Sequence, residues 1–280
     1  MIEKAYAKCN IALNIVDKRE DGFHEIETII LPLKLHDSLD IDISQNKDDF
    51  VICDDYSIKI EKYNLCHKAI DLAREKWHFK EHFDINIHKN IFLQSGLGGG
   101  SADAAATIRA IIKLLKLNVK ENDLIEVATK IGSDVPYMLY NKPSLVTGVG
   151  QKIEYFTFKD DSYVLLVKPK EGLSTKEVYE NYDNSFKGNC NINEIKKELE
   201  THSGNLQKDI SNSLEQPAFN LLPILKDTKE ELIQAGFDTV FMTGSGSCLV
   251  AITKNKKLAK KTEKAYFYKG FQVELTGFLN

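Results

Sequence analysis

A cluster of glycines joined directly to an alanine-rich segment constrains this chain more than any other feature of its sequence. In "NIFLQSGLGGGSADAAATIRAIIKLL", residues 90–115, four glycines fall within 96–100 and apolar residues then recur with helical spacing. The first N–H groups of a helix are unpaired and carry partial positive charge, and glycines upstream let an anion approach the backbone. The stretch therefore predicts a phosphate-binding loop that leads into a helix, with Ser101 as the N-cap. A simple tight turn is the alternative.

Two common phosphate-binding loops are excluded by the residues that follow the glycines. A P-loop has lysine directly after its last glycine, and this chain has Ser101 there. The dinucleotide-binding fingerprint ends in glycine or alanine, where "GLGGGS" again has serine. Asp103 adds a carboxylate beside the predicted anion site, and we expect it to serve the helix dipole, with help in holding a magnesium ion as the alternative.

Length and composition predict the general class of the protein. A chain of 280 residues is long for a single core, and we place two domains at 1–150 and 151–280. The net charge of −4 argues against a dedicated nucleic-acid binder, and no apolar run reaches the roughly 18 to 20 residues that cross a bilayer. Five scattered cysteines, none spaced CxxC, predict reduced thiols. These features predict a cytoplasmic protein without a nucleic-acid or membrane partner.

Periodicity predicts the elements on either side of the glycine cluster. Residues 6–16, "YAKCNIALNIV", alternate as a strand with one buried apolar face and one polar face that carries Lys8, Asn10 and Asn14. Residues 64–77 have helical spacing, and 83–88 alternate as a strand. Two further stretches predict helices, which are 219–236 with an interruption at Pro223 and the basic, solvated segment 254–270.

The motif "GLGGGSADAAA" resembles the central phosphate-binding motif of the GHMP small-molecule kinases. Other motifs resemble that family in the same order along the chain, and these are "AKCNIALNIVDKREDGFHEI", "NLCHKA", "IGSDVPYML", "KPKEGLSTKEVY", "NSLE" and "MTGSGSCLVAI". The resemblance implies a two-lobed α+β fold, with an N-terminal domain like ribosomal protein S5 domain 2 and a ferredoxin-like α/β C-terminal domain. It also implies transfer of the γ-phosphate of ATP, with Mg²⁺, to an alcohol.

The same resemblance implies the catalytic and nucleotide-binding residues. Asp134 of "GSDVP" would accept the proton of the acceptor hydroxyl, and Lys8 would orient that carboxylate. Without the resemblance, Lys8 would be a surface lysine, Asp134 a helix N-cap and Asn64 another helix N-cap. The implied ATP-binding residues are Asn64, Leu93, Gln94, Ser95, Gly96, Leu97, Gly98, Gly99, Gly100, Ser101, Gly244 and Ser245, of which Ser101 is also the implied metal ligand.

The N-terminal motif is similar to that of family members whose acceptor is a cytidine diphosphate-linked methylerythritol, phosphorylated at its 2-hydroxyl in the non-mevalonate isoprenoid route. Aromatic rings would sandwich the cytosine base. The implied substrate-binding residues are Asn10, Phe23, His24, Thr175 and Tyr179. A homodimer is compatible with the resemblance.

Two alternatives stay open at this point. One is a GHMP kinase that acts on a mevalonate-type or sugar alcohol. The other is a nucleotide-binding relative with little catalysis, because Gln94 and Ala102 stand where the family usually has glycine and serine.

Overall fold

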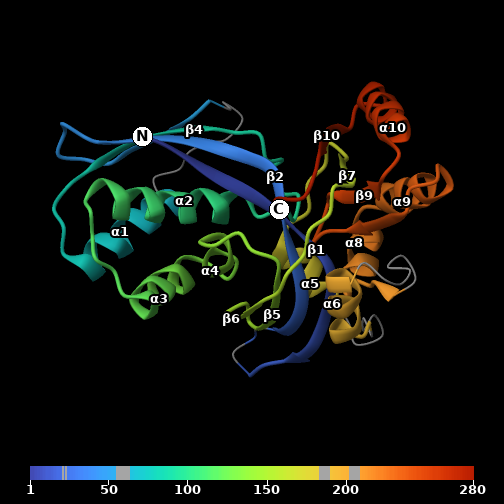
Figure 1. Ribbon diagram of the computed structural model, residues 1–280, viewed down its shortest axis with the longest axis horizontal. Helices are drawn as coiled ribbons and strands as arrows, with labels where there is room; N and C mark the ends of the chain where they lie inside the picture. Colours follow the sequence, from blue (N-terminus) through green and yellow to red (C-terminus); the bar gives the residue numbers. More distant parts are fainter. Residues whose placement is uncertain (21, 23, 55–63, 183–189, 202–208) are drawn as a thin grey trace. The chain divides into compact units, whose positions relative to one another are not determined.

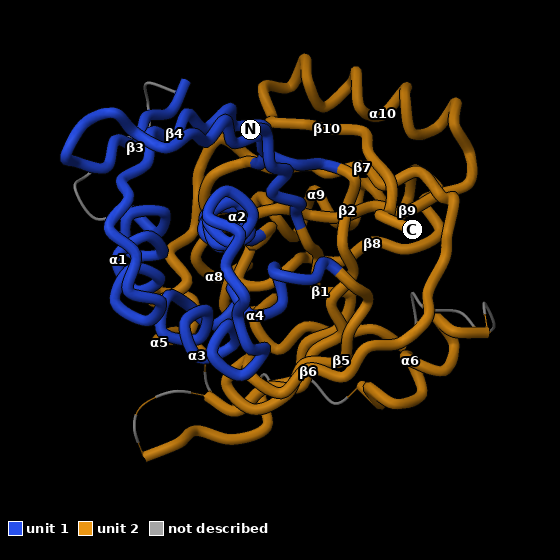
Figure 2. The backbone as a smooth tube through the Cα atoms, turned by 60° about the vertical axis from the view of Figure 1, so that its left-hand side comes forward, with its two compact units in different colours: residues 1–7, 35–91, 98–141 blue, residues 8–34, 92–97, 142–280 orange. Residues whose placement is uncertain are grey.

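The computed structural model describes residues 1–20, 22, 24–54, 64–182, 190–201 and 209–280 (Figure 1). Its backbone groups into two compact units, coloured separately in Figure 2. The first unit contains residues 1–7, 35–91 and 98–141, and the second contains 8–34, 92–97 and 142–280. The glycine cluster is therefore divided between the units after Leu97. A division into domains at residue 150 remains a prediction of the sequence.

The first unit combines a sheet with helices on one of its faces (Figure 1). The Ser38–Ile43 part of β2 pairs antiparallel with β4, and β4 pairs parallel with β3. The helix and the strand predicted at 64–77 and 83–88 are confirmed as α1 and β4. The unit contains the start of β1 (Ile2–Lys18), the end of β2 (His24–Ile43), β3 (Phe50–Cys53), α1 (Leu65–Trp77), β4 (Phe83–His88), α2 (Gly99–Leu114), α3 (Glu121–Ile131) and α4 (Val135–Met138).

The second unit contains a four-stranded antiparallel sheet in the order β10-β7-β9-β8. Numbered along the chain this is 4-1-3-2, the strand order of a ferredoxin-like fold, so that prediction is confirmed. The unit also contains the rest of β1 and β2, then β5 (Ser144–Gly148), β6 (Lys152–Tyr155), β7 (Tyr163–Lys168), α5 (Thr175–Glu180), α6 (Ile192–Thr201), α8 (Glu215–Leu221), α9 (Ile224–Gln234), β8 (Thr239–Met242), β9 (Leu249–Thr253), α10 (Lys256–Tyr268) and β10 (Gln272–Thr276).

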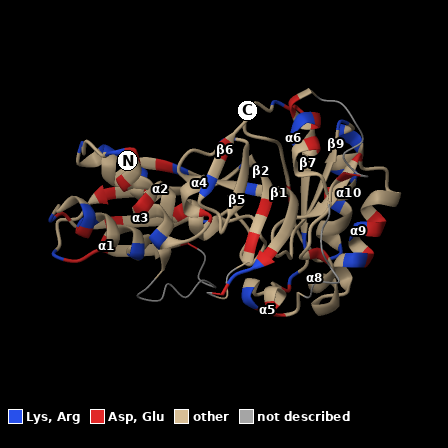
Figure 3. Ribbon diagram, turned by 90° about the horizontal axis from the view of Figure 1, so that it is seen from below, with Lys and Arg blue, Asp and Glu red and all other residues tan. Residues whose placement is uncertain are grey.

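Helices α9 and α10 of the second unit each bury an apolar face against this sheet. Leu232 of α9 and Tyr266 of α10 belong to the same buried cluster as Leu165 and Val240 of the sheet. The interruption predicted at Pro223 is confirmed, because α8 ends at Leu221 and α9 begins at Ile224. The lysines of α10, coloured blue in Figure 3, are exposed, as predicted for a solvated helix face. Within the described chain, no helix combines the length and the apolarity that a bilayer crossing requires.

The predicted polar face of β1 is buried, which corrects the sequence-based expectation for this strand. Lys8 and Asn10 are each only 4% exposed. Loops of the same unit cover this face, because Lys8 N donates to Leu97 O at 3.1 Å and Asn10 N donates to Thr243 Oγ1 at 2.9 Å. The surface-lysine alternative for Lys8 is therefore wrong.

Candidate functional site

The last glycines of the cluster form the amino end of α2 in the first unit. Gly98 is the N-cap in the left-handed conformation, with φ 75°, and the helix begins at Gly99. Ser101 is therefore inside the first turn, and its predicted N-cap role is wrong, because a glycine adopts the capping conformation without steric cost. The first helical bond runs from Ala102 N to Gly98 O at 2.9 Å. The backbone N–H groups of residues 99–101 thus have no partner within the helix, as an anion site requires.

A buried charge cluster anchors α2 to the strand end before it. Lys89 Nζ pairs with Asp37 and, at 2.7 Å, with Asp103 Oδ2. Asp37 Oδ1 also accepts the backbone N–H groups of Asn90 and Ile91 at 2.6 and 2.8 Å. Asp103 lies beyond the first turn of α2, which contains no acidic residue. It therefore does not serve the helix dipole. That prediction is wrong, and the carboxylate is used in an ion pair instead.

Asp103 is expected to retain a proton within this cluster. One buried ammonium faces two carboxylates, so a proton is retained on the group with fewer donors. Asp37 has three donors, whereas Asp103 Oδ1 has no partner among the described residues. Burial, opposed in part by Lys89, raises the pKa of Asp103 to about 7. The carboxylates in turn raise the pKa of Lys89 despite its burial.

Asp103→Asn is expected to remove a pH dependence of stability. Between about pH 4 and pH 7 the folded wild type retains a proton that the unfolded chain has released, so its stability falls as pH rises through this window and is constant above it. The rise from the ordinary value to about 7 is about three pKa units, and one unit corresponds to about 1.4 kcal/mol, so the wild type is expected to lose about 4 kcal/mol relative to Asp103→Asn across this window. Urea unfolding at several pH values measures this difference.

Lys89→Met is the contrasting variant for that experiment. It leaves two buried carboxyl groups without their cation, so it should destabilise the protein by about 3 to 5 kcal/mol near neutral pH. Equal pH slopes in the wild type and Asp103→Asn would contradict the proposed protonation of Asp103.

The first part of the glycine cluster packs against a second glycine loop within the second unit, formed by residues 243–248. Ser247 N donates to Gln94 O and Cys248 N donates to Ser95 O, both at 3.2 Å. Gly96 has φ 74°, and a Cβ at this position would lie 2.1 Å from Thr243 O. The close approach of the two loops therefore depends on a glycine at position 96.

Gln94 adopts the backbone conformation for which the family's usual glycine is suited. Its φ is 48°, and its side chain lies against Gly172, where an added Cβ would be 2.1 Å from Gln94 Oε1. A glycine on the neighbouring turn thus makes room for the glutamine. The other departure, Ala102, is buried in α2.

A hydrogen-bonded relay orients Lys8 on β1. Lys8 Nζ donates to Asn10 Oδ1 at 2.6 Å, and Asn10 Nδ2 donates to Thr28 Oγ1 at 2.9 Å. Thr28 Oγ1 in turn donates to Ala12 O at 2.7 Å. Thr28 accepts a hydrogen bond from the Asn10 side chain, and Thr243 accepts one from the Asn10 backbone N–H. Sequence reasoning missed both threonines, because neither residue stands out from its local pattern.

The predicted acceptor residues of the second unit also come together in part. The His24 and Tyr179 rings contact each other directly, with centroids 5.1 Å apart. Burial, with a smaller effect of Lys18, lowers the pKa of His24. Thr175 Oγ1 and Ser245 Oγ are hydrogen-bonded at 2.9 Å, which links α5 to the 243–248 loop. Phe23 lies outside the described residues.

Two predicted residues of the first unit occupy helix N-cap positions. Asn64 caps α1, with its Oδ1 accepting from His67 N at 3.0 Å, so the capping alternative for this residue is confirmed. Its predicted contact with ATP stays a prediction. Asp134 holds the N-cap position of α4, but its side chain makes no capping bond within the described structure. Capping therefore gives no structural reason for an aspartate at position 134.

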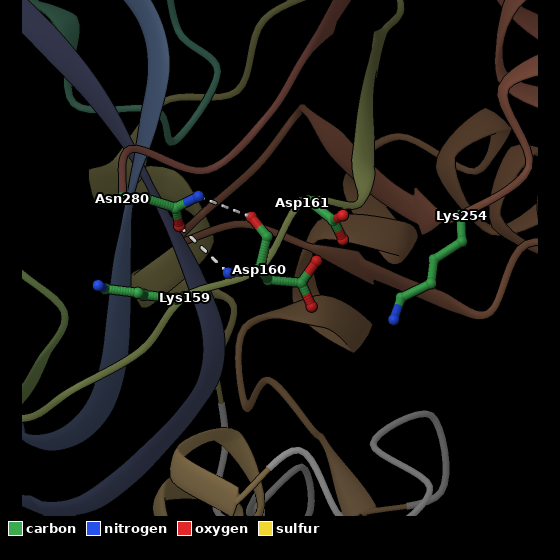
Figure 4. Close-up of a pocket in the computed structure, with 5 residues that line it drawn as sticks. All are labelled: Lys159, Asp160, Asp161, Lys254 and Asn280. Atoms are coloured by element: carbon green, nitrogen blue, oxygen red, sulfur yellow. Dashed lines mark hydrogen bonds between the residues drawn. The ribbon is translucent and has the colours of Figure 1, made fainter.

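A surface hollow of about 360 Å³ in the second unit is separate from these residues. Lys159, Asp160, Asp161, Lys254 and Asn280 line it (Figure 4), and Asn280 exchanges two hydrogen bonds with the Asp160 backbone. None of the predicted site residues lines this hollow. Over the residues that the structure describes, no group of three histidine, cysteine or acidic side chains is placed to hold a metal ion.

Two protein-family models match separate stretches of the chain. The model described as GHMP kinases N terminal domain matches residues 64–142, and the model described as GHMP kinases C terminal matches residues 191–270. Together with the α+β fold and the two glycine loops, these matches define the class, and the chain belongs to the GHMP kinase family.

Within this family, the chain is similar over most of its length to 4-diphosphocytidyl-2-C-methyl-D-erythritol kinases. The chain is 37% identical to that of Thermoanaerobacter pseudethanolicus, over 94% of this chain and 90% of the relative. It is 34% identical to that of Caldicellulosiruptor saccharolyticus, over 93% and 91%. A crystal structure of 4-(cytidine 5'-diphospho)-2C-methyl-D-erythritol kinase superposes with a TM-score of 0.85 and 26% identity over the whole of both chains.

Proposed function

We propose that this protein transfers the γ-phosphate of ATP to the 2-hydroxyl of 4-diphosphocytidyl-2-C-methyl-D-erythritol, in the non-mevalonate isoprenoid route. The observation that carries the proposal is the likeness to kinases of this name over more than nine tenths of the chain. The two glycine loops that pack together beside the buried Lys8 and Asn10 support it, since phosphoryl transfer depends on positioning and on electrostatic stabilisation.

In this proposal Asp134 accepts the proton of the acceptor hydroxyl, and Lys8 supports that carboxylate and the developing alkoxide. The assignment rests on the family motif at each position. The relay through Asn10 and Thr28 supports the role given to Lys8, because it orients the ammonium group on the buried face of β1.

The amino end of α2 fits the phosphates of ATP, because its first N–H groups have no helical partner and Gly98 leaves the approach free of a Cβ. An Mg²⁺ ion that ATP carries takes one or two protein ligands and several waters, which fits a chain whose described residues form no metal cage. Ser101, in the first turn of α2, is the proposed ligand. When bound, the ion would neutralise charge on the phosphates.

We expect Tyr179→Ala to raise the KM for the acceptor about 5- to 100-fold, because a stacked aromatic ring contributes about 1 to 3 kcal/mol per base. The KM for ATP should not change. Tyr179→Phe keeps the ring that contacts His24, so it is the matched control and should behave as wild type. Steady-state kinetics with each substrate varied in turn measure both constants. An unchanged acceptor KM in Tyr179→Ala would remove this tyrosine from the base-binding site.

A coupled ADP-release assay tests the function as a whole. The panel contains the cytidine diphosphate-linked methylerythritol, the same alcohol without its cytidine group, mevalonate and a sugar. Turnover that requires the cytidine group is the expected result. Turnover of mevalonate or the sugar alone would assign a different acceptor, and ATP binding without turnover of any alcohol would favour the nucleotide-binding relative.

A further inference from the structure

The segment Asn212–Glu215, which reads "NSLE" and is called the NSLE turn here, holds the strand end that leads into the 243–248 loop. Asn212 Nδ2 donates to Met242 O at 2.9 Å and to Gly244 O at 2.8 Å. Its Oδ1 accepts from Leu214 N at 2.9 Å, so both the NH₂ group and the oxygen of this buried side chain are hydrogen-bonded. Glu215 adds a second contact, since its Oε1 accepts from Met242 N at 3.2 Å.

The NSLE turn is also joined to β1, the strand that carries Lys8 and Asn10. Ser213 N donates to Leu13 O at 2.9 Å, and Ile15 N donates to Ser213 Oγ at 3.0 Å. The turn therefore connects the 243–248 loop to this strand within the second unit. These bonds therefore help to fix the relative position of two segments that the sequence separates by about two hundred residues.

The bond to Gly244 determines the direction of the next backbone N–H. In a trans peptide the C=O of one residue and the N–H of the following residue point in opposite directions. Since Asn212 holds the Gly244 carbonyl, the Ser245 N–H points away from the NSLE turn. Among the described residues this N–H has no acceptor, although Ser245 is only 8% exposed. A backbone donor without a protein partner can be satisfied by ordered water or by a ligand.

Gly244 also lies close to Asn10. It has φ 55°, and a Cβ at this position would be 3.3 Å from Asn10 Oδ1, the atom that receives the Lys8 hydrogen bond. The peptide between residues 244 and 245 is therefore next to the Lys8 relay, where a phosphate or an alkoxide would carry negative charge under the proposed function.

We infer that Asn212 is a positioning residue that fixes the 244–245 peptide and so presents the Ser245 N–H to a phosphate oxygen. The inference rests on the proposed kinase function for the identity of that oxygen. A backbone donor aimed at developing charge typically contributes about 10² to 10³ in kcat, and it does so only while its peptide is held in one orientation. Asn212 acts through this peptide and need not touch the substrate.

Asn212→Asp is the sharpest test, because it keeps the size of the side chain and its acceptor oxygen. It replaces the donating NH₂ with an oxygen that faces two carbonyl groups, so the peptide is no longer held. We expect kcat to fall about 10- to 100-fold at pH 8 with little change in the acceptor KM. Burial beside carbonyl oxygens raises the pKa of such a carboxyl group, so activity should partly return as pH falls and the protonated form donates one bond.

Ile252→Val is the matched control for a general loss of stability. Ile252 is buried in β9 of the same unit, outside the 243–248 loop, and its shortening costs about 1 kcal/mol. This variant should keep the wild-type kcat and pH profile. The inference is overturned if Asn212→Asp keeps the wild-type kcat, or if Ile252→Val loses as much kcat as Asn212→Asp at a similar loss of melting temperature.

A binding experiment separates this inference from the proposed function. The probe is a non-hydrolysable imido analogue of ATP, measured by calorimetry and by the amide NMR signal of Ser245. The signal should shift on titration of the wild type and should not shift in Asn212→Asp. If no acceptor is phosphorylated but this difference is seen, the acceptor assignment fails and the role of Asn212 stands. Equal shifts in both proteins would reject the role of Asn212 whatever the acceptor.

Discussion

Asp134→Asn is expected to lower kcat about 10² to 10⁴-fold, the usual contribution of a general base, while the protein remains folded. The amide has nearly the shape of the carboxylate but cannot accept the hydroxyl proton. Asparagine is nearly isosteric with aspartate and is favoured equally at an N-cap position, so stability should change by less than about 1 kcal/mol. Single-turnover phosphorylation and thermal unfolding measure the two quantities.

Asp103→Asn is the control for the Asp134 experiment. This variant also removes a carboxylate from the first unit, but the role of Asp103 is structural, because it is paired with Lys89. The kcat of Asp103→Asn should therefore stay within a fewfold of wild type. Wild-type turnover by Asp134→Asn would show that another group takes the proton, and the catalytic assignment would then be wrong.

Gly96→Ala is expected to destabilise the protein by more than about 3 kcal/mol and to abolish activity. Two costs combine, since the left-handed conformation is unfavourable for alanine by about 1 to 2 kcal/mol and the new Cβ would lie 2.1 Å from Thr243 O. The backbone of one of the two loops must then move. Denaturant unfolding and ADP release measure the effects.

Gly236→Ala separates the two costs. Gly236 also has a positive φ, of 98°, but a Cβ there would meet nothing within 4 Å. This variant should lose only about 1 to 2 kcal/mol and retain activity. Equal losses in the two variants would show that conformational strain, and not the approach of Gly96 to Thr243, explains the effect.

The sequence predicted most of the fold because its signals are local. Helical spacing located α1, alternation located β4, and Pro223 marked the boundary between α8 and α9. The co-ordered motifs predicted the family and the ferredoxin-like strand order, which the comparisons and the β10-β7-β9-β8 order confirmed. The catalytic and binding roles of individual residues stay predictions, to be decided by the variants above.

Features that depend on distant residues were predicted incorrectly or missed. Alternation placed Lys8 on an exposed face, yet loops from elsewhere in the chain bury it. Ser101 is a residue type favoured at N-caps, but Gly98 is the N-cap of α2, because glycine adopts the left-handed backbone conformation found there. Asp103 is bonded to Lys89, a partner that no spacing rule connects to it.

By itself, the sequence determined where the chain turns, which segments are helical or extended, and which residues can approach an anion, because these properties depend on neighbours within a few positions. Only the tertiary structure decided which polar groups are buried and which partners satisfy them. The bonds of Asn212 to Gly244 and of Lys8 to Asn10 form in a packed interior from which water is excluded, and burial there is set by segments far apart in the chain.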